Sequence, residues 1–172
     1  MKSGERANDG GPKPLYTRDQ RIRRDASHWT LVQGILAPLQ FLVFLVSLAL
    51  IFRYLWTGDG LWLANLSIIV KTLVLYTIMI TGSIWEKDVF GKWLFAEPFY
   101  WEDMVSMLVL ALHTAYLICL LEGLLDHRSL MVLALAAYVT YVINAGQFIL
   151  KLRAARLGRT EFSGARPLGS GR

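Results

Sequence analysis

The sequence predicts an all-α integral membrane protein, a four-helix bundle with both termini on the cytoplasmic side. Hydrophobic residues make up 55% of the 172 residues, and the mean hydropathy is +0.42, which is too apolar for an ordinary soluble domain. The apolar residues fall into four runs, each close to the ~20 residues that cross a hydrocarbon core of about 30 Å. Basic residues gather beside alternate ends of these runs, which sets the orientation.

Residues 1–28 form a polar, basic arm ahead of the first apolar run. Residues 1–14 cannot bury enough apolar surface to offset the entropy cost of folding, so we expect them to be disordered. The stretch 16–28 is basic and is expected to lie along the membrane surface. The arm has no early apolar core of the kind that a cleavable secretion signal needs, so the first span is expected to direct insertion.

The transmembrane domain is expected to cover residues 29–157. Short turns at 58–60 and 123–128 join neighbouring runs, which predicts antiparallel packing. The tail, residues 158–172, is rich in Gly, Arg and Ser and is expected to be disordered. The four spans are predicted at about Leu31–Tyr54, Leu63–Trp85, Met104–Leu121 and Leu130–Leu150.

The positive charges orient the spans. The first and third loops carry only Arg53 and Arg128, whereas the middle loop carries Lys87 and Lys92. Both termini and the middle loop are therefore expected on the cytoplasmic side of the membrane. The other basic residues near the spans are Lys13, Arg18, Arg21, Arg23 and Arg24 before the first, and Lys151, Arg153, Arg156 and Arg159 after the last.

Several function classes are excluded by composition and motifs. Lys and Arg total 18 against 13 acids, but the excess lies in the terminal tails, so we expect no nucleic-acid partner. A single cysteine, Cys119, rules out an internal disulfide and a cysteine metal cluster. The chain has no Gly-rich phosphate loop and no His-Glu-x-x-His motif, so any reaction is expected to be redox-neutral and free of nucleotide.

Each span carries one stripe of polar side chains at helical spacing. Polar groups at bilayer depth are costly unless satisfied, so they are expected to face inward and to mark a functional site. We therefore predict a polar-lined cavity that opens towards the cytoplasmic leaflet. The stripes are Gln33, Gln40 and Ser47; Thr72, Tyr76, Met79, Ser83 and Glu86; Glu102, Ser106, Val109 and His113; and Asn144, Gln147 and Lys151, with Tyr138 and Tyr141 beyond them.

The ionisable members of these stripes also have structural interpretations. Glu86 closes a helix, where the dipole disfavours a negative charge, so pairing with Lys87 or a functional role is expected. Glu102 and Asp103 begin a helix, so a capping role stands beside a catalytic one. His113 is either an interhelical hydrogen bonder or an axial metal ligand. Lys71, deep in the second span, needs a buried partner such as His113 or a substrate contact.

Four stretches of the chain closely resemble the vinyl bacteriochlorophyllide hydratase family of phototrophic bacteria: 23–48, 70–96, 99–117 and 138–157. The polar and aromatic strings WEKDVFG (85–91) and FYWEDMVSML (99–108) carry the resemblance, because ordinary spanning helices do not contain them. The similarity covers about four fifths of the chain and leaves out only the arm and the tail.

The resemblance implies a hydro-lyase of bacteriochlorophyll a synthesis. Its reaction would add water to the ring-A vinyl group of chlorophyllide a or 3-vinyl bacteriochlorophyllide a, giving a 1-hydroxyethyl group. The expected partners are membrane lipid and the magnesium tetrapyrrole, with other enzymes of the pathway as candidates. No added cofactor is expected, because the substrate carries its own magnesium.

Hydration of this vinyl group requires a proton on its terminal carbon, and hence a general acid. A carboxylic acid partly buried among aromatic rings stays protonated near neutrality. Glu102 or Glu86 is the first candidate and Asp103 the next, with a second carboxylate or His113 to orient the water and remove its proton.

Binding a flat magnesium tetrapyrrole requires further groups. His113 is the candidate axial ligand to the substrate's magnesium, and a cation at the interface would bind the propionate. Aromatic walls are expected from Trp85, Trp93, Phe99, Tyr100 and Trp101, polar substrate contacts from Lys71, Asn144, Gln147 and Lys151, and the propionate cation from Lys87, Lys92, Lys151 or Arg153.

Two other functions remain open at this point. A non-catalytic pigment carrier or assembly factor would use the same aromatic walls but would need no proton donor. A small proton-coupled transporter is suggested by Lys71 and His113, although the internal repeat usual in transporters is missing. Replacing Glu86 and Glu102 by Gln separates the carrier from the hydratase.

Overall fold

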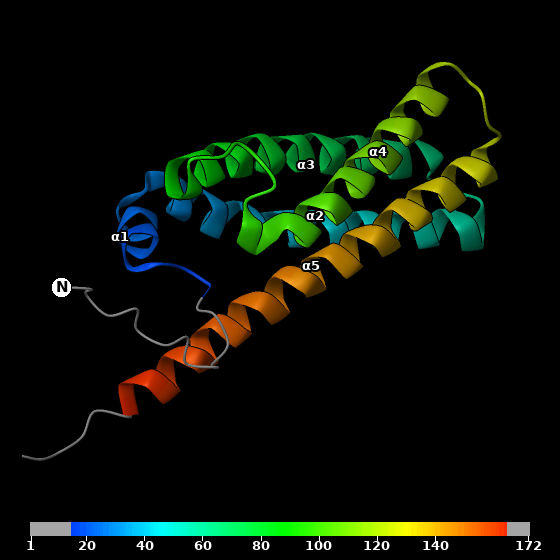
Figure 1. The fold of residues 1–172 in the computed structure, drawn as a ribbon. Coiled ribbons are helices and arrows are strands. Elements are labelled where there is room, and N and C mark those ends of the chain that lie inside the picture. The colour runs from blue at the N-terminus through cyan, green and yellow to red at the C-terminus, as the bar shows by residue number, and fades with distance from the viewer. Residues whose placement is uncertain (1–14, 165–172) are drawn as a thin grey trace, which may run out of the picture.

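The computed structural model describes the backbone of residues 15–164 and the side chains of residues 15–153. Its elements are all helical (Figure 1). The predicted disorder of residues 1–14 lies outside the described residues. In chain order the elements are α1 (Arg18–Ala26), α2 (His28–Thr57), α3 (Leu61–Phe90), the short 3₁₀ helix η1 (Glu97–Phe99), α4 (Tyr100–Leu121) and α5 (His127–Gly164).

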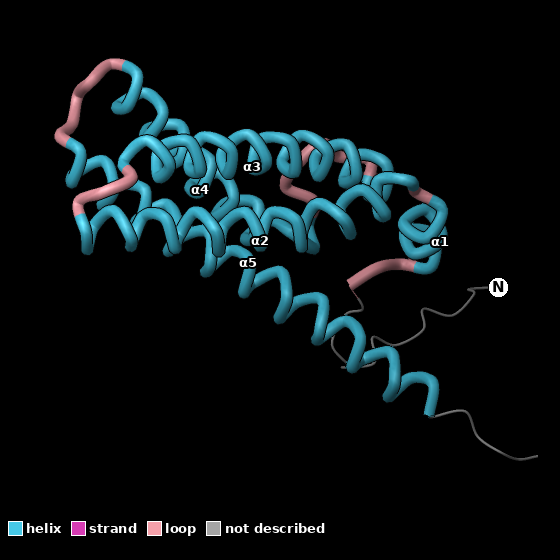
Figure 2. The backbone as a smooth tube through the Cα atoms, turned by 180° about the vertical axis from the view of Figure 1, so that it is seen from behind, coloured by secondary structure: helices cyan, strands magenta, loops and turns pink. Residues whose placement is uncertain are grey.

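Four antiparallel helices, α2 to α5, form the bundle, with α2 packed chiefly on α3 and α4 on α5 (Figures 1 and 2). All four are long and apolar enough to cross a membrane, which confirms the predicted all-α fold with four spans; the orientation of the termini stays a prediction. The short α1 and the α3–α4 connection lie at one end, which we call the acidic end because it holds Glu86, Glu102 and Asp103. The α2–α3 and α4–α5 turns lie at the other end.

The helices extend beyond the predicted spans at several ends. Helix α3 continues to Phe90, where Gly91 with a φ of 78° ends it, and α4 starts at Tyr100. Helix α5 runs to Gly164, so the tail predicted to be disordered from residue 158 has a helical backbone over 158–164. The sequence KLRAARL consists of good helix formers, which explains the extension. Residues 165–172 lie outside the described part.

Burial in the bundle follows a narrow inner face. Ile51, Ile68 and Tyr116 are fully buried along the axis, whereas Leu42 and Ile80 are about 60% exposed. Many other large apolar side chains of the spans are exposed in the same way. Soluble monomers rarely present contiguous apolar surface on this scale, so the outer surface is one that lipid covers.

Candidate active site

Two carboxyl groups meet at the acidic end, beneath the loop that joins α3 to η1. Glu86 lies in the last turn of α3 and Asp103 in the first turn of α4; they are 5% and 3% exposed. Consecutive backbone amides of one loop bond an oxygen of each, which places the two carboxyl groups next to each other. Two carboxylates buried side by side repel each other, so a proton on one of the two is favoured. The pair is therefore built to hold one proton inside the protein.

Two consecutive backbone amides of the loop fix this pair. The Phe95 N–H donates to Asp103 Oδ2 at 2.8 Å, and the Ala96 N–H donates to Glu86 Oε2 at 3.2 Å. Phe95 has a φ of 59°, the one positive value at a non-glycine residue between 15 and 164. Backbone strain of this kind persists only where the surroundings hold it. The strained turn aims both amides at the carboxyl oxygens.

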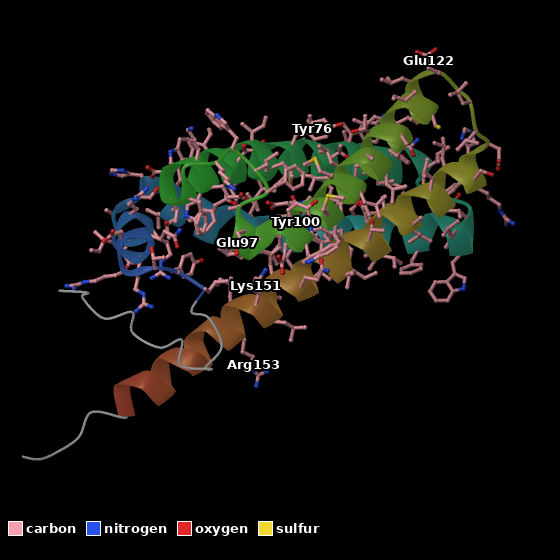
Figure 3. The ribbon with its side chains drawn as sticks, in the orientation of Figure 1. Tyr76, Glu97, Tyr100, Glu122, Lys151 and Arg153 are labelled. Carbon is pink, nitrogen blue, oxygen red and sulfur yellow. The ribbon has the colours of Figure 1, made fainter. Side chains whose placement is uncertain are left out.

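The third acid, Glu102, has a different partner. Lys151 on α5 donates to Glu102 Oε2 at 2.5 Å, and the two form an ion pair. One turn further along α4, Ser106 donates to the Glu102 carbonyl and accepts from Asn144 Nδ2 at 2.7 Å. Glu102 is thus ion-paired across the bundle, and its role as proton donor stays a prediction. Figure 3 shows Lys151 beside Tyr100 at this end, far from Glu122.

The five predicted aromatic walls divide into two groups. Trp85 and Phe99 pack edge to face at 5.8 Å and belong to an internal cluster with Phe90, Tyr16 and Phe148. The exposed group consists of Trp93, Tyr100 and Trp101, which are 58%, 46% and 70% exposed. The first group is packed inside the protein, and the second is free to contact a ligand.

An apolar groove of about 430 Å³ runs between α3 and α4 towards the carboxyl pair. Met79 and Ser83 precede Glu86 at helical spacing on α3, while Met107 and Leu110 follow Asp103 on α4, so the groove walls continue into the pair. Ser83 Oγ donates to the Trp93 carbonyl at 2.5 Å, which fixes the loop over the groove. The groove residues are Met79, Ile80, Ser83, Ile84, Trp93, Leu94, Met107 and Leu110.

A second groove, of about 620 Å³, lies on the other side of Ile84, between the α1–α2 junction and α3. It has several charged walls, with Arg23 and Lys87 on its rim. Lys87 does not pair with Glu86 as one interpretation expected; its ammonium donates to the Gly91 carbonyl at 3.2 Å and lies 5.8 Å from the Trp93 ring.

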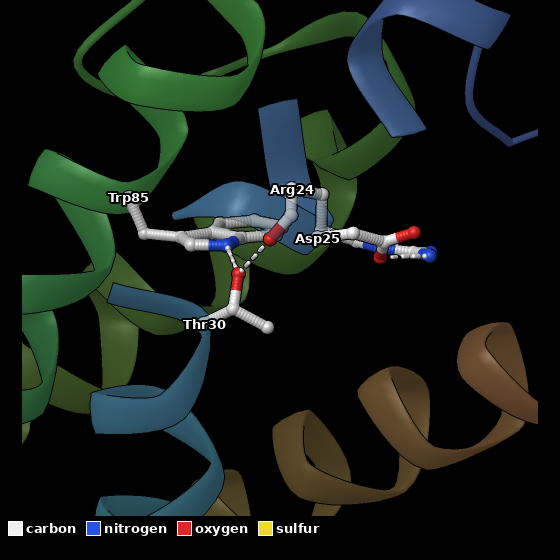
Figure 4. Close-up of polar contacts among 4 residues, drawn as sticks. All are labelled: Arg24, Asp25, Thr30 and Trp85. Carbon is white, nitrogen blue, oxygen red and sulfur yellow. Dashed lines mark hydrogen bonds and ion pairs between the residues drawn. The ribbon is translucent and has the colours of Figure 1, made fainter. Parts of the chain in front are cut away.

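The basic stretch ahead of α2 packs against the bundle through side-chain contacts. Thr30 Oγ1 accepts from Trp85 Nε1 at 3.0 Å and donates to the Arg24 carbonyl at 2.6 Å (Figure 4). Arg24 pairs with Asp25 and lies 4.8 Å above the ring of Tyr16, which is 6% exposed. Burial raises the pKa of Tyr16 above its usual value, and the Arg24 guanidinium opposes part of that rise.

A separate polar cluster lies in the middle of the bundle. Lys71 Nζ lies 3.1 Å from His113 Nε2, and His113 Nδ1 lies 2.8 Å from the Val109 carbonyl. Nδ1 thus carries the proton and Nε2 accepts from Lys71. Lys71 also sits 4.0 Å from the Tyr141 ring, while His113 stacks on Tyr138. The buried partner predicted for Lys71 is therefore His113.

This arrangement does not bring His113 or Lys71 to the carboxyl pair. His113 is eleven residues along α4 from Glu102, about 16 Å at 1.5 Å per residue. Both of its ring nitrogens are engaged, so an axial bond to a substrate magnesium would displace Lys71. The catalytic and metal roles of His113, and a substrate contact of Lys71, stay predictions.

The predicted polar-lined cavity between four stripes stays a prediction. Several stripe residues are hydrogen bonded to neighbouring helices inside the bundle, as Ser47 is to Tyr138 at 2.6 Å and Gln33 to Thr81 at 2.7 Å. The apolar groove follows the edge of α3 and α4. The sequence analysis did not identify the α4 wall of this groove, Met107 and Leu110, although their helical spacing from Asp103 is visible in the sequence.

Comparison with known proteins identifies the family. A family model described as 2-vinyl bacteriochlorophyllide hydratase matches residues 16–154. The chain belongs to this family.

The family contains two curated relatives with the name 2-vinyl bacteriochlorophyllide hydratase. The protein from Rhodobacter capsulatus is 63% identical over 84% of this chain and 84% of its own. The protein from Cereibacter sphaeroides is 64% identical over 83% of this chain and 89% of its own. The resemblance deduced from the spans and the two polar strings is confirmed. No solved structure matches the chain.

Proposed function

We propose that this protein adds water to the vinyl side group of a bacteriochlorophyllide and that the Glu86–Asp103 pair donates the proton. Membership in the hydratase family supports the reaction. One structural observation supports the residues: a buried pair of adjacent carboxyl groups continues, at helical spacing, the two helix faces that line an apolar groove. A groove of this size falls in the range of small-molecule sites.

The reaction follows from the proton that the pair holds. One carboxyl group gives its proton to the terminal vinyl carbon, whose π electrons form the new C–H bond. The inner carbon becomes a cation, delocalised over the conjugated macrocycle. A water oxygen bonds to that carbon and loses a proton to the carboxylate just formed. The elements of water are added, and the pair regains its starting state without any transfer of electrons to a cofactor.

The loop amides contribute to this cycle. When a carboxyl group has given up its proton, the Phe95 and Ala96 N–H groups are already aimed at the oxygens that carry the charge. Donors placed in advance cost no reorganisation during the reaction. Glu102, held by Lys151, adds a fixed ion pair beside the site and is not required to change its protonation.

The ligand is proposed to lie with its flat face against Met79 and Met107 and its edge under Trp93. The three exposed aromatic residues are at the rim, and two cations, Lys87 in the last turn of α3 and Lys92 in the loop that follows, are available for a propionate group. The acidic end is proposed to face the cytoplasm, in the bacterial inner membrane, because positive charges concentrate there.

The test is the reaction of the purified protein in vesicles with a vinyl bacteriochlorophyllide. The wild type is expected to give the hydroxyethyl product, heavier by one water. Glu86→Gln should bind pigment but hydrate about 10²–10⁴-fold more slowly, since a general acid contributes that much. Glu97→Gln, an exposed acid in the same connection, is the matched control and should behave as wild type.

A pigment carrier predicts a different result. It would bind the vinyl compound in wild type and in Glu86→Gln alike and release it unchanged. Absence of the hydroxyethyl product from wild-type protein that demonstrably binds pigment would refute the hydratase proposal.

A further inference from the structure

Several buried amide atoms in the bundle have no hydrogen-bond partner among the described residues. They belong to three side chains: both amide atoms of Gln40, the Asn144 oxygen and the Gln147 oxygen. Gln40 is 2% exposed and Asn144 is 9% exposed. Buried polar groups are normally paired, so unpaired ones point to a bound molecule that hydrogen bonds them.

The helix register places these amides in one layer. Ser47 on α2 bonds Tyr138 on α5, and Phe44, one turn earlier, contacts Tyr141, one turn later. Continuing this antiparallel register by one more turn puts Gln40 opposite the residue that follows Asn144. Gln147 lies one turn beyond Asn144 on the same helix. The layer is therefore shared between α2 and α5.

This amide layer borders the carboxyl groups. Asn144 donates to Ser106 Oγ at 2.7 Å, and Ser106 donates to the Glu102 carbonyl at 2.8 Å. Ser106 is also one helical turn from Asp103 on α4. Asn144 is thus linked through Ser106 to the turn of α4 that carries Glu102 and Asp103.

Water is the ligand that fits these amides. An unpaired amide NH₂ and three unpaired oxygens need both donors and acceptors from a small molecule, and a buried water typically makes about three such bonds. An apolar pigment would leave all four atoms unsatisfied. The lipid-facing groove provides pigment but little water, whereas hydration consumes one water for each turnover.

We propose that Gln40, Asn144 and Gln147 hold a layer of bound water that supplies the nucleophile of the hydration reaction. This inference rests on the proposed function and assigns the three amides as positioning residues. Pigment enters from the lipid side and water from the bundle interior, so the two reactants reach the acid pair from different directions. The water oxygen bonds to the cationic carbon and its proton passes to the nearby carboxylate.

The experiment separates proton donation from water delivery. In deuterium oxide, reversible protonation of the vinyl group exchanges its terminal hydrogens for deuterium, whether or not water adds afterwards. Gln40→Met and Asn144→Leu keep side-chain volume but remove the amide. Both are expected to bind pigment, judged by its absorption shift, and to hydrate it about tenfold to a hundredfold more slowly. Deuterium exchange should continue.

The matched control is Gln33→Met, on the same helix two turns earlier, because the Gln33 amide nitrogen already donates to Thr81 and to the Ile78 carbonyl. It should leave the ratio of exchange to hydration unchanged. Asn144→Ser, which keeps a group that binds water, should hydrate faster than Asn144→Ala; this comparison holds even if the larger changes weaken folding.

The outcomes distinguish the two proposals. Wild-type hydration rates in both Gln40→Met and Asn144→Leu, or a parallel fall of exchange and hydration, would overturn the water layer while leaving the acid pair intact. A wild-type protein that binds pigment but neither exchanges nor hydrates would overturn the proposed function and the water layer together.

Discussion

The acidic end and the middle of the bundle each bury ionisable side chains, but they satisfy them differently. In the middle, Lys71 and His113 pair with each other and are enclosed by the rings of Tyr138 and Tyr141. At the acidic end, Glu86 and Asp103 are held by two amides of a strained loop and lie where a groove ends. The first cluster is closed on all sides, and the second adjoins space for a ligand.

This difference shows that burial of a charged side chain inside a membrane does not by itself identify a functional site. Lys71 is the most costly residue in the spans on insertion scales, and it would be the first candidate by that criterion. The Lys71 ammonium has a hydrogen-bond partner within the protein, so the Lys71–His113 pair has a structural explanation. Function is better indicated where the protein holds a proton beside an open groove.

The largest effect should come from Asp103→Asn. Because the proton is shared between two carboxyl groups, this change removes half of the donor and leaves Glu86 without its partner. We expect kcat to fall by about 10²–10⁴-fold with pigment affinity retained. Asp59→Asn, at the opposite end of the bundle, is the control. Near wild-type kcat in Asp103→Asn would remove the functional distinction between the two regions.

A smaller loss is expected from Phe95→Val. A β-branched residue adopts the positive φ of this position poorly, so both loop amides should move away from the carboxyl oxygens. We expect kcat to fall by about tenfold or more, as misplaced catalytic groups do. Phe95→Gly accepts the same φ and should lose much less, only the contact with the Tyr100 ring. Equal losses in the two variants would show that the backbone geometry is unimportant.

Lys71→Met should affect stability rather than turnover. It leaves the His113 acceptor buried and unpaired, at a cost of about 1–3 kcal/mol in unfolding free energy. The double variant Lys71→Met/His113→Phe removes both partners and should recover part of that loss. Thermal unfolding in detergent measures stability, and kcat should stay at the wild-type level. A large fall in kcat for folded Lys71→Met would restore the predicted substrate role of Lys71.

The smallest effect concerns Tyr16, whose raised pKa makes docking of α1 depend on pH. The folded state favours the neutral Tyr16 ring. Its contribution to the free energy of unfolding is therefore fully present below the unfolded pKa of about 10 and is lost as pH rises through the higher folded pKa. A tyrosinate absorbance titration of wild type minus Tyr16→Phe should show one group titrating above 10. A midpoint at or below 10 would contradict docking.

Much of the fold was predictable because lipid imposes simple lengths and periods. Four apolar runs predicted four spans, and the order Met79, Ser83, Glu86 placed an acid beyond a groove wall through helical spacing alone. The helical continuation of α5 over 158–164 was not anticipated. The composition of the tail predicted disorder, whereas the good helix formers just before residue 158 extend α5 into it.

The chemistry was harder to predict because it depends on partners distant in sequence. Glu102 and Asp103 are adjacent on the chain, but only the crossing of α5, 49 residues after Glu102, pairs Glu102 with Lys151, whereas Asp103 lies beside Glu86 beneath the loop. The φ of Phe95 has no signal in the sequence. Polar stripes on four helices predicted a cavity; in the structure several of their members are hydrogen bonded across the bundle, and the buried amide of Gln40 has no partner among the described residues.

The sideways opening of the groove changes how this enzyme meets its substrate. Ile80 and Trp93, both more than half exposed on the lipid-facing side, border the entrance. A pigment dissolved in the bilayer therefore arrives by two-dimensional diffusion and leaves the same way, without passing through water. Its effective concentration is a mole fraction in lipid, so diluting the pigment with more lipid at constant bulk concentration should slow turnover.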